Sequence, residues 1–112
     1  MKQNEIKLVG NVVFDPEVIT AGNGNSFSKL RMATNTKIKE NERTCFVDVK
    51  LFGRAYRDFE YFEVEKGDKI IVDGELVQET WEKDGEKRST YVVYANSVVK
   101  VHRKERTESS AF

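Results

Sequence analysis

The sequence predicts an all-β fold, a five-stranded barrel with one short helix between its third and fourth strands. Five stretches rich in β-branched and aromatic residues are separated by turns of glycine, asparagine and aspartate. Between the third and fourth stretches, the apolar residues change from a period of two to a helical period. The chain has 112 residues, of which 38% are hydrophobic, so it can bury one small core. We therefore expect one domain over residues 1–101 and a short flexible tail over 102–112.

The first two strands are separated by a turn. Residues 5–14 are rich in Ile and Val and predict the first strand, with Gly10 as a bulge or a point of close backbone approach. An Asp-Pro pair ends it, and residues 20–25 carry the glycine and asparagine of a turn. Residues 27–36 alternate with period two, which predicts the second strand.

A polar segment stands between the second strand and the third. Residues 37–43 are charged and lack an apolar face, which predicts a mobile loop or a hairpin tip. Residues 44–52 are β-branched and alternate, so they predict the third strand. Residues 54–65 predict a short amphipathic helix. One face of this helix is apolar: Ala55, Phe59 and Phe62.

Two strands follow the helix. Residues 69–77 predict the fourth strand, with Gly74 as a bulge, and residues 89–101 predict the fifth. Between them, residues 78–88 form a polar excursion that carries Trp81 and a turn. Five strands with one helix between the third and the fourth is the order of the OB-fold, a Greek-key barrel. Closed sheets of this size bend sharply at glycines.

The charges balance overall but are unevenly distributed. The 19 basic and 19 acidic residues argue against a protein that coats nucleic acid through bulk positive charge. Seven basic and three acidic residues lie within 27–54, whereas two basic and five acidic residues lie within 55–68. We expect one side of the molecule to be positive and another negative.

Cys45 is the only cysteine, which excludes an internal disulfide and a zinc site built from several cysteines. Residues 1–13 contain only a short apolar run, unlike a signal peptide or a membrane span. We expect a soluble cytoplasmic protein without a cofactor.

Alternation sorts the second and third strands into two faces. One set is apolar and is expected to form the core: Leu30, Met32, Cys45, Val47, Val49 and Leu51. The opposite set mixes phenylalanines with charged residues: Phe27, Lys29, Arg31, Phe46, Asp48, Lys50 and Phe52. Aromatic rings offer platforms for any unstacked base, while cations follow phosphates, so this face predicts sequence-independent binding of single-stranded nucleic acid. The alternative is that the phenylalanines pack under the helix, under a loop or against a second subunit.

Trp81 lies in a charged hairpin, which is hard to reconcile with a place in the core. Its neighbours include three cations, Lys83, Lys87 and Arg88. This setting favours a base-stacking role over a packing anchor.

Several short motifs follow one another over residues 4–101: NEIKLVGNV with DPE after it, a turn near Gly24, LRMAT, VKLFGRA, EKGDKIIVDGEL, and the Trp81 hairpin ending in DGEKR. In these motifs and in their order the chain resembles the bacterial and phage single-stranded DNA-binding protein family. The resemblance implies a non-catalytic protein that coats and protects single-stranded DNA during replication, recombination and repair. It also implies base stacking by three residues and phosphate contacts by three others: Phe46, Phe52 and Trp81, and Arg54, Lys66 and Arg88.

The chain departs from the family pattern at four positions. Ile38 stands where a second stacking aromatic is usual, and Asp48, Glu79 and Thr80 stand where basic residues are common. The resemblance further implies a homotetramer or dimer that pairs through residues 6–11, with Val47 at a position often found in the tetramer contact. The tail lacks the family's acidic tip, so we expect a short phage- or plasmid-type member and do not expect the tail to recruit replication enzymes. A truncated chain would look the same.

Two other functions fit parts of the sequence. A metal-dependent nuclease would need a catalytic group, but the only histidine, His102, lies in the expected tail, and the carboxylates within 60–68 are typical of a solvated face. A primosomal or recombination accessory module of the same fold would act mainly through protein contacts, which the neutral charge suits. RNA binding is a variant of the main hypothesis.

Overall fold

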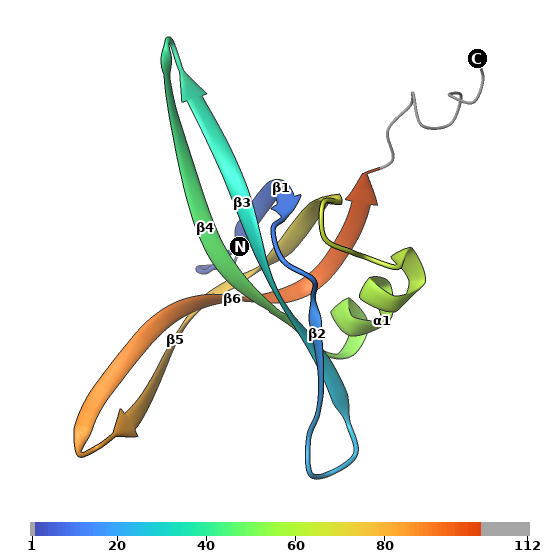
Figure 1. Cartoon of the computed structure of the whole chain (residues 1–112), viewed down its shortest axis with the longest axis vertical. Coiled ribbons are helices and arrows are strands. Elements are labelled where there is room, and N and C mark those ends of the chain that lie inside the picture. Colours follow the sequence, from blue (N-terminus) through green and yellow to red (C-terminus); the bar gives the residue numbers. More distant parts are fainter. Residues whose placement is uncertain (1, 102–112) are drawn as a thin grey trace.

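Long, strongly coiled strands dominate the computed structural model, which describes residues 2–101 (Figure 1). The expected tail over 102–112, including His102, lies outside the described residues. The elements in chain order are β1 (Ile6–Val12), β2 (Glu17–Thr20), β3 (Ser26–Ile38), β4 (Asn41–Leu51), α1 (Gly53–Phe62), β5 (Lys69–Lys83) and β6 (Glu86–Val101).

The strands close into one barrel. Their order is β1-β5-β6-β4-β3-β2, and an additional pairing of β1 with β3 joins the ends of the five-stranded ring. Strands β4 and β6 are parallel, and the other pairs are antiparallel. The predicted five-stranded OB-fold barrel, with its helix between the third and fourth strands of the ring, is confirmed. Strand β2 was not predicted, because four residues that pair only with β3 carry too short a pattern.

Two glycines allow the barrel to bend, as expected. Gly10 lies where β1 leaves β5 and turns to β3, and a Cβ atom there would fall on the backbone carbonyl of Ala33. Gly74 lies at a bulge in the β5–β6 pairing, and its Cβ would fall on the backbone of Tyr94. Only a residue without a side chain permits these approaches.

The core lies inside the ring and under α1. The predicted inward residues Leu30, Met32, Val49 and Leu51 are buried, and Val47 is half-buried at the rim. The prediction is wrong for Cys45, whose side chain is exposed. By this point β4 has left the barrel, so no second layer covers its apolar side.

Helix α1 packs its predicted face onto the barrel. Ala55 and Phe59 are buried, and Phe62 is partly buried against the core. The helix ends three residues before the predicted boundary, because Glu63 adopts a left-handed conformation with φ 51° and caps the helix.

Two hairpins extend beyond the barrel as arms (Figure 1). The arm of β3 and β4 turns at residues 39–40, and the arm of β5 and β6 turns at 84–85. Residues 37–43 are therefore a hairpin tip made largely of strand, and residues 78–88 are strand rather than an irregular excursion. Both faces of each arm meet solvent, so the apolar alternation that marks a half-buried strand is missing here.

Candidate nucleic-acid interface

Three aromatic rings meet where β4 ends and α1 begins. The rings of Phe27 and Phe52 are stacked with centroids 4.8 Å apart, and the ring of Tyr94 meets Phe52 edge-on at 5.2 Å. Phe52 still exposes 39% of its surface, so one aromatic platform remains open to solvent. Tyr94 was missed by sequence reasoning. It alternates with Val93 and Ala95, which are buried, and that period of two on β6 was the available signal.

A hollow of about 650 Å³ extends this aromatic group toward α1. Phe27, Phe52, Tyr56 and Arg57 line it, together with residues of the turn after β2. Arg54, a predicted phosphate contact, is exposed in the first turn of α1, two residues after Phe52. The hollow leaves room for a flat ligand beside Phe52 at the end of β4. Arg54 and Arg57 could interact there with an anionic backbone.

A second aromatic site lies further along the arm of β3 and β4. Phe46 exposes 54% of its surface, and the guanidinium of Arg31 lies 5.8 Å from the ring centroid, within cation–π range. The same Arg31 donates from Nη1 to Oδ1 of Asp48 at 3.0 Å. Arg31 and Phe46 are thus close together, as predicted, but the guanidinium of Arg31 is already paired with Asp48.

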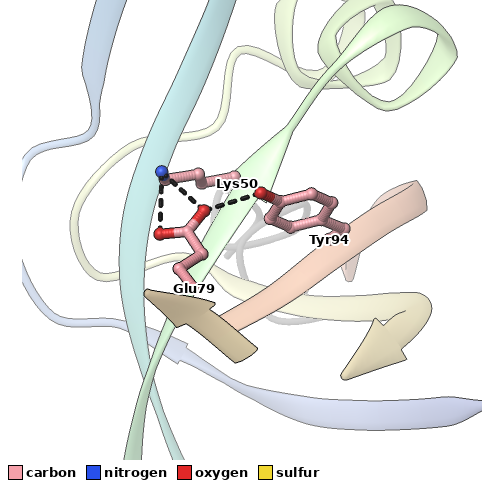
Figure 2. A network of polar contacts seen from close by, with 3 residues as sticks. All are labelled: Lys50, Glu79 and Tyr94. Carbon is pink, nitrogen blue, oxygen red and sulfur yellow. Dashed lines mark hydrogen bonds and ion pairs between the residues drawn. The ribbon is translucent and has the colours of Figure 1, made fainter. Parts of the chain in front are cut away.

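Lys50, Glu79 and Tyr94 form a polar network between three strands (Figure 2). Nζ of Lys50 donates to both carboxylate oxygens of Glu79, at 3.2 and 2.9 Å. The hydroxyl of Tyr94 donates to Oε2 of Glu79 at 2.6 Å. The hydrogen bond from Tyr94 and then that from Lys50 lower the pKa of Glu79, with a smaller contribution from the charge of Lys29. The same bond to Glu79 raises the pKa of Tyr94, because it favours the protonated phenol.

This network predicts a pH-dependent contribution to stability. Because the folded-state pKa of Glu79 lies below its ordinary value of 4.5, the contribution is complete above that pH and declines as the pH falls through the lower folded value. Urea unfolding midpoints measured on both sides of pH 4.5 should fall more for the parent protein than for Glu79→Gln. Parallel losses in the two proteins would contradict the assignment.

Trp81 and Arg88 face each other across the arm of β5 and β6. Trp81 exposes 45% of its surface, and Arg88 pairs weakly with Glu86 at 3.5 Å. By strand alternation, Trp81 and Lys83 lie on the same side of β5 as Glu79, whereas Thr80 and Lys87 lie on the other side. The tryptophan therefore shares a side with the polar network and with the aromatic platform that the network borders.

The remaining predicted positions are spread over the molecule. Lys29 stands beside Lys50 in the register of β3 and β4, and Lys50 stands beside Tyr94 in the register of β4 and β6. Ile38 is exposed at the end of β3. Lys66 is exposed in the connection between α1 and β5, which belongs to neither arm.

Within residues 2–101, no three His, Cys, Asp or Glu side chains are arranged to hold a metal ion. None of the helices in the same part of the chain has the length and apolar character to cross a membrane.

Comparison with known proteins places this geometry in context. Residues 3–101 match the family described as "Single-strand binding protein family". The single-stranded DNA-binding protein of Wolinella succinogenes is 38% identical over 85% of this chain and 62% of its own, and that of Helicobacter hepaticus is 33% identical over 85% and 59%. The chain thus spans about 60% of the length of these relatives.

A solved structure shares the fold. The chain of the "Plasmodium falciparum SSB complex with ssDNA" superposes with a TM-score of 0.79, covering 91% of this chain and 97% of that chain at 16% identity. At this identity the likeness shows the barrel and its connections, and nothing about individual contacts.

Proposed function

The chain belongs to the single-strand binding protein family, and on that premise we propose that it binds single-stranded DNA without sequence preference. It would coat and protect exposed strands in the cytoplasm during replication, recombination and repair, without catalysing a reaction. The observation that carries the proposal is the exposure of Phe52 and Trp81 on the same side of the sheet, with cations around them. Stacking on such rings accepts any base.

Each part of this surface has a proposed role. The stacking residues are Phe46, Phe52 and Trp81, with the ring of Phe27 stacked on that of Phe52. The cations would follow the phosphates along β3, β4, the start of α1 and the arm of β5 and β6: Lys29, Arg31, Lys50, Arg54, Lys83 and Arg88. Lys87 lies on the other side of that arm from Trp81 and would meet a strand only if the strand wraps around the arm. Lys66 would contact a strand only if the strand continues past α1, because it lies in the connection between α1 and β5.

The test is a binding titration of labelled oligo-dT followed by fluorescence anisotropy, with unlabelled oligo-dC, oligo-dA and duplex as competitors. Single strands of each base should compete within about tenfold of one another, because stacking depends little on the base, and duplex should compete poorly. Affinity should fall as salt rises. Basic side chains release counterions from the phosphates when the strand binds, and this release is less favourable at high salt. Absence of binding at low salt would contradict the proposal and favour the accessory module that acts through protein contacts.

The chain is also proposed to form a homo-oligomer through β1. Residues Ile6 to Asn11 pair with β5 along one edge, whereas β3 pairs with β1 only at Asn11 and Val12. The other edge of β1 is therefore open to a second copy. Nearby lies a hollow of about 380 Å³ lined by apolar residues including Ile6, Leu8, Val47, Leu76 and Tyr91. Native mass spectrometry should give a dimer or tetramer of the 12.9 kDa chain, and a monomer would contradict the pairing.

A further inference from the structure

Two cations on the proposed interface are already held by carboxylates of the same chain. Arg31 is paired with Asp48, and Lys50 is paired with Glu79. The second pair is the more protected one, because Lys50 and Glu79 expose only 23% and 25% of their side chains. For comparison, Lys7 and Asp73 are separated by 3.7 Å and are far more exposed. Lys50 is thus not freely available to a ligand.

Glu79 is held from three strands at once. Its own position is on β5, Lys50 reaches it from β4, and Tyr94 reaches it from β6. Tyr94 and Lys50 both donate to the same oxygen, Oε2, so the orientation of the carboxylate is fixed. The depressed pKa of Glu79 agrees with a carboxylate that stays ionised in this place.

The register explains why a carboxylate fits here. Lys29 and Lys50 are direct neighbours across β3 and β4, and like charges in such a pair repel each other. The carboxylate of Glu79, bonded to Lys50 and attracted by the charge of Lys29, offsets this repulsion. A phosphate group would offset it equally well, since both anions accept charge-assisted hydrogen bonds from an ammonium group. Tyr94, which anchors Glu79, also touches Phe52, so the anion lies beside the stacking platform.

We propose that Glu79 acts as an internal competitor for phosphate, so that a bound strand gains Lys50 only by displacing the Glu79 carboxylate. This inference rests on the proposed function. It names Glu79 as the residue that limits the affinity for a strand. Displacement exchanges one anion for another at Lys50. When a phosphate takes the place of Glu79 at Lys50, the strand releases a counterion. The displaced carboxylate of Glu79 then attracts a cation from solution. This exchange therefore contributes little to the salt dependence of binding.

The first test compares Glu79→Gln with the parent protein in oligo-dT titrations between 50 and 200 mM salt. The glutamine amide can still accept from Tyr94 but no longer neutralises Lys50. The slope of log K against log salt should become steeper by about 0.7, the value of one contact to a single strand. The advantage of the variant over the parent should then grow about 2.6-fold as salt falls from 200 to 50 mM. Glu63→Gln, which removes the same charge at the end of α1, should leave the slope unchanged.

The second test asks whether Glu79 acts through Lys50. In a Lys50→Gln background, the change Glu79→Gln should no longer steepen the slope, because the cation that it frees is absent. Tyr94→Phe, which keeps the ring beside Phe52 but removes one anchor of Glu79, should steepen the slope by less than Glu79→Gln does.

The outcomes separate this inference from the proposed function. The competitor role is wrong if all proteins bind oligo-dT and Glu79→Gln keeps the salt slope of the parent. It is also wrong if Glu79→Gln steepens the slope as much in the Lys50→Gln background as in the parent. In both cases the proposed strand binding stands. A lower urea midpoint for Glu79→Gln with an unchanged slope also overturns the competitor role, because the network is then purely structural. If the parent does not bind oligo-dT at all, the proposed function itself fails.

Discussion

Trp81→Ala is expected to weaken oligo-dT binding by about 1–3 kcal/mol while leaving the slope of affinity against salt unchanged, because the side chain offers a stacking surface and no charge. Anisotropy of labelled oligo-dT measures both quantities. The side chain lies on an arm with solvent on both sides, so the free energy of unfolding should change by no more than about 0.5 kcal/mol.

The control for this variant is Thr80→Ala, since Thr80 is exposed on the same strand but on its other side. It should bind like the parent. Equal losses for both variants would mean that the arm is sensitive to any truncation and that Trp81 has no special role.

Leu51→Ala is expected to lower the free energy of unfolding by about 2–5 kcal/mol, because it leaves a cavity in the barrel. Leu51 is fully buried, whereas the next residue, Phe52, is 39% exposed and faces the proposed DNA-binding side. Phe52→Ala should therefore weaken oligo-dT binding by about 1–3 kcal/mol. It should destabilise the fold less, by about 0.5–1.5 kcal/mol for each of the two ring contacts that it loses.

Urea unfolding should show the larger loss of stability for Leu51→Ala, and oligo-dT binding should show the larger loss of affinity for Phe52→Ala. Folded Leu51→Ala should bind nearly as well as the parent. If Phe52→Ala unfolds the protein and leaves any residual binding unchanged, Phe52 belongs to the core and the assignment of faces is wrong.

The strand pattern predicted the barrel because its core residues obey a period of two. Leu30, Met32, Val49 and Leu51 stand at every second position of their strands, next to mostly charged or aromatic residues, and all four are buried. The same pattern misplaced Cys45, because alternation records which side a residue lies on and not whether another layer covers that side. Where the strands continue as solvated arms, their pairing depends on backbone hydrogen bonds, and the side chains carry no periodic signal.

The residues of the proposed interface could be assigned to faces from the sequence, but their arrangement in space could not. The phenylalanines and cations of β3 and β4 could be assigned to one face from alternation alone. The ion pair of Lys50 and Glu79 joins residues 29 positions apart, on strands β4 and β5, which both pair with β6. No local pattern encodes that contact. Tyr94 carried a signal in the alternation of β6, and its hydrogen bond to Glu79 emerged only from the fold.

We therefore expect charge to contribute less to the proposed binding than the number of basic residues suggests. Asp48 is paired with Arg31 beside the ring of Phe46, and Glu79 is paired with Lys50 beside Tyr94, whose ring contacts Phe52. Both carboxylates stand at positions where the family resemblance led us to expect basic residues. Stacking on Phe52 and Trp81 should supply a larger share of the affinity than in a protein whose cations are all free.

The most direct measurement of the central claim is the intrinsic fluorescence of Trp81, the only tryptophan in the chain, during a titration with oligo-dT at low salt. Stacking of a base on the indole predicts quenching that saturates as the strand fills the site, with the same midpoint as the anisotropy of labelled oligo-dT. Unchanged Trp81 emission at saturating oligo-dT would contradict the claim that this surface binds single-stranded DNA by stacking.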